Sequence, residues 1–297
     1  MGMAKTLLKL TLFSIFVLAS RFSAAAETIY TCKHILFLGN SLTFMPDVTN
    51  THPVTPTFVK ALLDSKNIPN DIEWITAGGH TLENHWSEGE FQYRLEKKHY
   101  DCVFIQPYTI EALELPPCFR KLGPNGIPGP EGRENFLVYA KLMIDLVRSK
   151  KSIPIVIEPW IYDPHHAWLQ DNFECRNFPK SAETWYGGNL EEYQRRLDKG
   201  YEDLKTDTGV EVLRIGDLWE KLRDNPDPTL PISAMYQPDH YHPTYLGAFL
   251  SALVIAERLS NLPADQFRYC PTQVEPTQAA LLEKLAKQFF PSFASAH

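Results

Sequence analysis

Short apolar runs alternate with helical periodicity along the chain, and this alternation constrains the fold more than any other feature. The expected strands are His34–Leu38, Ile72–Thr76, Cys102–Gln106, Ile153–Glu158 and Val210–Ile215. The expected helices are Thr55–Ser65, Asn84–Lys97, Glu134–Ser149, Leu190–Thr206, Pro243 to about Ser260, and Gln273–Phe290. Strands that alternate with helices in this way imply crossover connections and a parallel sheet covered on both faces. The sequence therefore predicts an α/β fold with a central parallel sheet.

Three long connections interrupt the alternation, at about 110–133, 159–188 and 224–241. Connections of this length in a compact domain are usually functional or mobile. The first two follow strands, so we expect them at the carboxyl end of the sheet, where open α/β folds bind ligands. Together with these insertions, residues 27–297 are expected to form a single domain.

The first 26 residues have the pattern of a signal peptide. Lys5 and Lys9 provide positive charge around a short apolar core, Leu10–Ala19, and Ala24 to Ala26 provide small residues for cleavage. The apolar core is too short for an ordinary membrane span. We therefore expect an exported protein, periplasmic or extracellular, that begins near Glu27 and has no stable membrane insertion.

The charge of the mature chain argues against binding to polyanions. Without Lys5, Lys9 and Arg21, 26 basic residues face 36 acidic ones, a formal charge of −10. A chain this acidic, with no basic run, is a poor candidate for nucleic acid or an anionic membrane. Its 44% hydrophobic content is ample for a packed core and excludes disorder. The sequence leaves the oligomeric state open.

Five cysteines are too few for a disulfide scaffold, but export makes disulfides possible. Cys102 lies in the apolar run "CVFIQP" and is predicted to be an unpaired, buried core residue. Cys32, Cys118, Cys175 and Cys270 then remain, and four cysteines allow three pairings.

The sequence does not predict a metal or another cofactor. No C-x-x-C or H-x-x-x-H spacing is present. Asp163, His165 and His166 cluster in the second insertion, but adjacent histidines rarely share an ion, and we interpret them as part of a surface loop.

Ser41 follows the first strand in "FLGNSLTF", and it is either a turn residue or a nucleophile. A serine nucleophile needs a base that a third group orients. Asp239 and His242 are three apart in "QPDHYHPTYLGAFL", before a helix with Pro243 at its expected first position. The alternative is that Asp239 and His242 only help to start that helix. His240 competes as the base, but it adjoins Asp239, so its side chain should point elsewhere.

Acyl chemistry also needs hydrogen-bond donors for the oxyanion that forms in the transition state. The Ser41 N–H is one candidate, and Gly79 in "TAGGHTL" supplies another after the second strand. Gln106 in "FIQPY" places an amide side chain after the third strand. Each of the first three strands is therefore followed by a group of the required kind.

These motifs resemble those of the SGNH (GDSL-type) hydrolases, a superfamily of serine esterases, lipases and carbohydrate deacetylases. "FLGNSLTF" matches the G-[DN]-S-[LF] block with Ser41 as nucleophile, and "GGHTL" is similar to the block whose glycine, here Gly79, donates to the oxyanion. "DHYHP" matches D-x-x-H, with Asp239 and His242 as orienter and base. "FIQPYTI" stands where G-x-N-D is usual, so Gln106 would replace the family's asparagine. The resemblance implies a flavodoxin-like three-layer α/β/α sandwich.

The sequence is therefore expected to encode a secreted serine esterase that forms an acyl-enzyme and needs no cofactor. Export and the aromatic residues of the insertions favour a carbohydrate O-acyl or acetyl ester as substrate. For the aromatic residues, packing that holds an insertion down is an equal alternative. A non-catalytic carbohydrate-binding protein and an acyltransferase remain as alternatives. The expected substrate contacts are Asn40, His80, Trp160, Tyr162 and Trp185.

Overall fold

The computed structural model describes residues 32–44, 53–115, 131–169 and 185–289. Its centre is a parallel sheet of five strands in the order β2-β1-β3-β4-β5. This sheet confirms the α/β class. The strands are β1 (His34–Gly39), β2 (Asp71–Thr76), β3 (Cys102–Ile105), β4 (Ile153–Glu158) and β5 (Glu211–Arg214).

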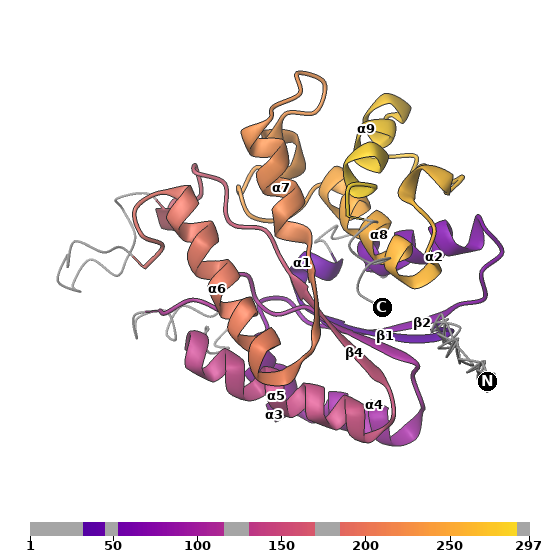
Figure 1. Ribbon diagram of the computed structural model, residues 1–297, viewed down its shortest axis with the longest axis vertical. Helices are drawn as coiled ribbons and strands as arrows, with labels where there is room; N and C mark the ends of the chain where they lie inside the picture. The colour runs from indigo at the N-terminus through magenta and orange to yellow at the C-terminus, as the bar shows by residue number, and fades with distance from the viewer. Residues whose placement is uncertain (1–31, 45–52, 116–130, 170–184, 290–297) are drawn as a thin grey trace, which may run out of the picture.

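Helices cover both faces of the sheet and complete the three-layer α/β/α sandwich (Figure 1). One face carries α2 (Val54–Asp64), α8 (Tyr245–Ser260) and α9 (Pro276–Ala286). The other face carries α3 (Leu82–Glu88), α4 (Glu90–Lys97), α5 (Arg133–Ser149) and α6 (Leu190–Thr208).

The core lies around the three central strands. All four residues of β3 are buried, and Phe37 of β1 stacks on Phe104 of β3 with ring centroids 4.9 Å apart. The edge strand β2 is only partly buried. Helix α8 is buried along almost its whole length, since α2 and α9 pack against it. Neither α8 nor another helix in the described ranges is long and apolar enough to cross a membrane.

Helix ends follow local capping chemistry. The Asn189 side chain caps the start of α6, and Gly209, with φ of 63°, ends it. The helix expected over Asn84–Lys97 is instead two helices, because Thr81 begins α3 with a capping box and Gly89, with φ of 77°, ends it. A single glycine at a left-handed position thus divides one amphipathic pattern.

Other differences from the expected elements lie near the carboxyl end of the chain. Helix α7 (Ile215–Asp224) begins directly after β5 and was not expected, because its first residue continues the apolar run of the strand. Helix α8 begins at Tyr245 with Thr244 as N-cap, so Pro243 precedes the helix and pairs with Tyr236 in an antiparallel bridge.

Parts of two long connections, 116–130 and 170–184, lie outside the described residues. The third, 224–241, is held by the short helix η4 (Ile232–Met235) and by an Asp227–Leu230 bridge.

Cys32 and Cys102 form a disulfide, which corrects the prediction that Cys102 is unpaired. Cys32 precedes β1, and Cys102 begins β3 opposite Ile35, so the two Cα atoms lie 5.6 Å apart. The position of Cys102 in a buried apolar run therefore does not mean that its thiol is free. Cys270 is exposed and forms no disulfide with the described residues, whereas the expected partners Cys118 and Cys175 lie outside them.

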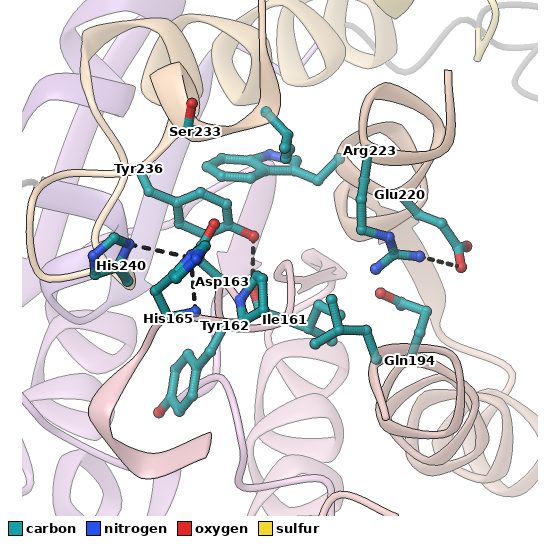
Figure 2. A pocket seen from close by; sticks show the side chains of 14 residues that line it. Ile161, Tyr162, Asp163, His165, Gln194, Glu220, Arg223, Ser233, Tyr236 and His240 are labelled. Carbon is teal, nitrogen blue, oxygen red and sulfur yellow. Dashed lines mark hydrogen bonds and ion pairs between the residues drawn. The ribbon is translucent and has the colours of Figure 1, made fainter. Parts of the chain in front are cut away.

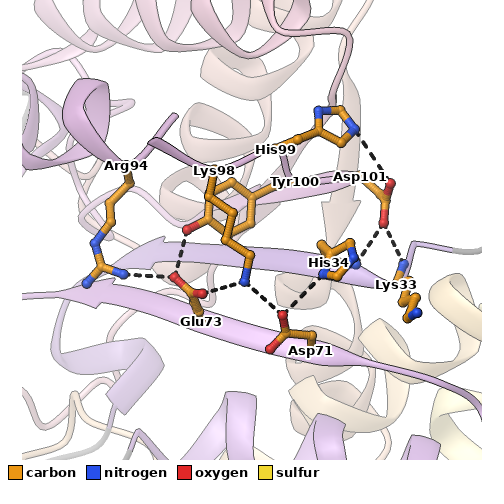
Figure 3. A network of polar contacts seen from close by, with 9 residues as sticks. All are labelled: Lys33, His34, Asp71, Glu73, Arg94, Lys98, His99, Tyr100 and Asp101. Carbon is orange, nitrogen blue, oxygen red and sulfur yellow. Dashed lines mark hydrogen bonds and ion pairs between the residues drawn. The ribbon is translucent and has the colours of Figure 1, made fainter. Parts of the chain in front are cut away.

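Charged residues join the amino ends of the first three strands (Figure 3). Lys98 Nζ donates to Asp71 Oδ2 over 2.7 Å and to Glu73 Oε1 over 2.5 Å, and Tyr100 Oη donates to Glu73 Oε2 over 2.7 Å. Asp101 accepts from the backbone N–H of the first β1 residue over 2.7 Å. These contacts hold β1, β2 and the start of β3 together at their amino ends, at the edge of the sheet opposite the carboxyl ends.

Replacing Glu257 with glutamine is expected to reduce the pH dependence of stability. This carboxyl is fully buried on α8, accepts from Ala264 N–H over 2.6 Å, and its burial raises its pKa from 4.5 to about 7. Because the pKa of Glu257 is raised in the folded protein, the contribution of this group to stability is fully present below pH 4.5 and is lost as the pH rises through 7. The free energy of unfolding should therefore fall by roughly 2–3 kcal/mol between pH 5 and 9 on account of this group. Urea unfolding of both proteins across that range tests this, and an equal slope in Glu257→Gln would contradict it.

Candidate active site

The carboxyl ends of the three adjacent strands β1, β2 and β3 place the predicted groups at one edge of the sheet. Gly39, the last residue of β1, pairs with Thr76, the last residue of β2. Ile105, the last residue of β3, pairs with Leu38. Ser41, Gly79 and Gln106 follow these ends within three residues, so the structure brings the three segments to the same edge.

A tight turn holds Ser41 after β1. The Asn40 carbonyl accepts from Thr43 N–H over 3.0 Å, and Asn40 Oδ1 accepts from Leu42 N–H over 3.1 Å. Asn40 Nδ2 donates to the His80 carbonyl over 3.1 Å. Asn40 is fully buried and links the turn to the next loop, and its expected contact with substrate stays a prediction.

Gly39 permits this turn because no side chain fits there. A Cβ atom on Gly39 would collide with Thr43 Oγ1 and would lie 3.0 Å from Thr43 Cβ and 3.2 Å from Gln106 Oε1. Contacts this short force neighbouring atoms to move. The glycine before Asn40 therefore allows the turn to approach the end of β3 closely.

A chain of hydrogen bonds joins Ser41, His242 and Asp239. His242 Nε2 lies 2.8 Å from Ser41 Oγ, and His242 Nδ1 lies 2.6 Å from Asp239 Oδ2. Although burial raises the pKa of Asp239, hydrogen bonds from the His242 ring and from the N–H groups of His242 and Tyr241 hold it below 3.8. The ionised carboxylate accepts the Nδ1 proton, so Nε2 is left to accept the Ser41 hydroxyl proton.

The loop that carries His242 is folded back on itself. Gln237 N–H donates to the His242 carbonyl over 2.8 Å, and His240 N–H donates to the Gln237 carbonyl over 2.9 Å. His240 has φ of 61°, and its Nδ1 lies 3.1 Å from Asp163 Oδ1. The competing histidine therefore turns to Asp163, whereas His242 faces Ser41.

The three expected oxyanion donors differ in whether they already donate hydrogen bonds to protein atoms. Gly79 has φ of 73°, and among the described residues no hydrogen bond engages its N–H or that of Ser41. The Gln106 amide is buried: its Oε1 accepts from Thr43 Oγ1 over 2.9 Å, and its Nε2 donates to the Pro107 carbonyl. One of the two Gln106 N–H groups thus has a protein partner.

Two buried histidines support the strand ends. His80 Nε2 lies 2.6 Å from Glu88 Oε1 and the ring is buried, so it supports the loop, and its contact with substrate stays a prediction. His85, which sequence reasoning treated only as a helix residue, lies with Nε2 2.9 Å from the Gly39 carbonyl. Burial lowers the pKa of His85 to about 4, so its neutral ring donates to the end of β1. No motif in the sequence signals this contact.

Comparison with known proteins tests the fold independently of these residues. No family model matches the chain, and no curated protein matches it by sequence. Solved structures do match. A protein assigned to the SGNH hydrolases from Slackia heliotrinireducens is 17% identical, with a TM-score of 0.53, over 76% of this chain and 97% of its own.

Two further structures agree over similar lengths. A DUF4886 family protein from Bacteroides uniformis is 12% identical, with a TM-score of 0.58, over 87% of this chain and 95% of its own. A variant of an acetyl-xylooligosaccharide esterase from Geobacillus is 13% identical, with a TM-score of 0.51, over 80% and 97%. The chain has the SGNH-hydrolase fold. At these identities the likeness establishes the fold.

The aromatic residues of the second insertion pack beneath the His242 loop of this SGNH fold. Trp160 stacks on Trp219 with ring centroids 4.1 Å apart, and its Nε1 donates to the Tyr241 carbonyl over 3.2 Å. Tyr162 lies 4.7 Å from the Tyr241 ring. Trp160 and Tyr162 are 3% and 1% exposed and pack against their neighbours, and their contact with substrate stays a prediction. Trp185 is half-buried and remains a predicted contact.

A cavity of about 420 Å³ lies between the loop after β4, α6, α7 and η4 of the SGNH fold (Figure 2). Its volume is in the range of small-molecule sites. Apolar side chains supply most of its wall, and a group of ionisable side chains lies on one side. The apolar residues include Ile161, Leu190, Trp219 and Ile232, and the ionisable group is Asp163, His165 and His240.

Proposed function

We propose that this protein hydrolyses carboxylic esters through a Ser41–His242–Asp239 triad. The observation that carries the proposal is the continuous pair of hydrogen bonds, 2.8 Å from Ser41 Oγ to His242 Nε2 and 2.6 Å from His242 Nδ1 to Asp239 Oδ2. Nucleophile, base and orienting carboxylate in this order are the arrangement that activates a serine.

In the proposed reaction, Ser41 Oγ attacks the acyl carbon while His242 Nε2 takes the hydroxyl proton. Asp239 holds the ring and stabilises the imidazolium that forms. His242 then gives the proton to the leaving alcohol, and an acyl-enzyme remains on Ser41. Water then attacks this ester while His242 Nε2 takes a proton from the water, and His242 gives that proton to Ser41 Oγ as the carboxylic acid leaves. The N–H groups of Ser41 and Gly79 and the Gln106 amide stabilise the oxyanion in both steps.

The proposed substrate is a carbohydrate O-acyl ester, in particular an acetylated saccharide. The similar Geobacillus structure is an acetyl-xylooligosaccharide esterase, which supports this class. The acidic mature chain disfavours an anionic lipid surface. We also propose export after cleavage near Ala26, in a segment outside the described residues.

Product analysis tests substrate and reaction together. The mature protein is incubated with acetylated xylooligosaccharides and, separately, with phospholipid vesicles, and Ser41→Ala serves as the control. Acetate release by the parent protein and not by Ser41→Ala supports the proposal. Release of fatty acid without release of acetate would contradict the substrate class. Acylated product formed on an added sugar acceptor would indicate a transferase. Absence of turnover of every ester by the folded protein would favour a binding protein.

Replacing Gln106 with alanine is expected to lower kcat/KM by ~10²–10³-fold, the usual cost of one oxyanion donor. Gln106→Glu is the matched variant, because it keeps the size and the oxygen that accepts from Thr43 but removes the N–H donors. Both variants should lose activity in steady-state hydrolysis of an activated ester, and Gln106→Glu should lose at least as much as Gln106→Ala because its carboxylate repels the oxyanion. Full activity in Gln106→Ala would remove Gln106 from the oxyanion site.

A further inference from the structure

Beside the cavity, the side chains of His165 and His240 both contact one carboxylate oxygen of Asp163 (Figure 2). His165 Nδ1 lies 2.8 Å from Asp163 Oδ1, and His240 Nδ1 lies 3.1 Å from the same oxygen. The sequence grouped Asp163 with the adjacent His165 and His166. The structure instead turns His166 to the Tyr162 ring, 4.2 Å away between centroids, and brings in His240 from the loop before α8.

We propose that Asp163, His165 and His240 bind a divalent transition-metal ion of the Zn²⁺ type. Two imidazole nitrogens and one carboxylate oxygen are a usual donor set for such an ion. The three donor atoms already lie within 4.8 Å of one another. Ligand atoms around tetrahedral Zn²⁺, with bonds of ~2.0–2.2 Å, lie ~3.3–3.5 Å apart. Both histidine nitrogens already lie 2.8 and 3.1 Å from Oδ1, so a shift of Oδ1 and a rotation of the exposed His165 ring would let an ion lie between the three atoms.

The surroundings of the cluster suit ion binding. Asp163 is 4% exposed and is held in place, since its N–H donates to the His240 carbonyl over 3.1 Å. The side chains of His165 and His240 are 74% and 41% exposed, so an ion can reach them from solvent. The three residues also line the cavity, so further coordination positions are available to water or to a ligand oxygen.

A second group of carboxylates, Glu158, Asp198 and Asp217, has similar spacing but a different chemistry. Arg214 lies among them, with Nε 3.1 Å from Glu158 Oε2 and Nη2 2.8 Å from Asp198 Oδ2. A guanidinium already supplies the positive charge there. The Asp163 cluster has no such cation among its described contacts and is the better metal site.

An ion at the Asp163 cluster would join two loops that meet at the candidate active site. Asp163 and His165 belong to the loop after β4, and His240 lies between Asp239 and His242. Metal bonds from His240 would restrain the loop that presents the His242 ring to Ser41. Zn²⁺ binding at this cluster does not depend on the proposed esterase activity.

The test uses the untagged mature protein after treatment with a chelator, followed by dialysis against Zn²⁺ and measurement of bound metal. His165→Ala and His240→Asn each remove one ligand. Asparagine suits the left-handed backbone at position 240, so this variant should fold. His99→Ala is the matched control, since His99 is an exposed histidine at the opposite edge of the sheet (Figure 3). The melting temperature is measured with and without Zn²⁺.

The parent protein and His99→Ala are expected to bind one Zn²⁺ per chain and to melt at higher temperature with the ion. Loss of an outer-shell partner usually costs 10–100-fold in metal affinity, so loss of a ligand should cost at least ~100-fold. Ca²⁺ and Mg²⁺, which prefer oxygen ligands, should bind far more weakly. The proposal is overturned if the parent protein binds no Zn²⁺, or if His165→Ala and His240→Asn bind it as tightly as His99→Ala.

Discussion

Replacing Ser41 with alanine is expected to lower kcat/KM for ester hydrolysis by at least ~10⁴-fold, because no other group forms the acyl-enzyme. His242 Nε2 loses the hydroxyl that lies 2.8 Å away, while the turn keeps its shape through the carbonyl and side chain of Asn40. Steady-state kinetics on an activated ester measure the effect. The residual rate in Ser41→Ala should be that of direct attack by water on the bound ester, helped only by the oxyanion donors.

The Ser41→Ala result needs a matched control, because an alanine can also perturb folding. Ser149→Ala changes a serine at the end of α5 whose hydroxyl donates to the Leu146 carbonyl over 2.6 Å. This variant should keep full activity, and both variants should melt within a few degrees of the parent protein. Activity in Ser41→Ala within ten-fold of the parent value would contradict the role of Ser41.

Replacing Asp239 with asparagine is expected to lower kcat by ~10⁴-fold, the effect of presenting the wrong histidine tautomer. Asparagine can keep the Oδ1 contacts with the N–H groups of Tyr241 and His242, 3.0 Å each, so the loop should hold. Its Nδ2 would then donate to His242 Nδ1, where the carboxylate accepts at 2.6 Å. The ring proton moves to Nε2, which can no longer accept from Ser41.

Ring nitrogen shifts of His242, measured by NMR, distinguish this mechanism from local unfolding. The parent protein should show a proton on Nδ1, and Asp239→Asn a proton on Nε2. Asp224→Asn, at the exposed end of α7, is the control with no expected change in rate or tautomer. An active Asp239→Asn variant with unchanged shifts would show that Asp239 does not orient the ring.

The sheet and the groups at its edge could be predicted because each follows from local pattern. An apolar run of strand length identifies β1, β3 and β4. Parallel strands end at one edge, so Ser41 and Gln106 had to lie near each other. The spacing of Asp239 and His242 likewise limits them to one turn before α8.

Features that depend on packing between distant segments could not be predicted in this way. Cys102 has the sequence surroundings of a core thiol, and only the pairing of β1 with β3 brings Cys32 to it. Trp160 lies in an insertion outside the expected strands and helices but is buried because Trp219 of α7 stacks on it. His240 meets Asp163 because two loops far apart in the chain fold together.

Labelling with a fluorophosphonate, followed by peptide mass spectrometry, tests most directly the claim that Ser41 is an activated nucleophile. The account predicts one labelled residue, Ser41, and loss of the label in His242→Ala, because the probe reacts only with a serine whose proton a base removes. No label on the folded protein with the probe in excess, or equal labelling of Ser41 in His242→Ala, would contradict it.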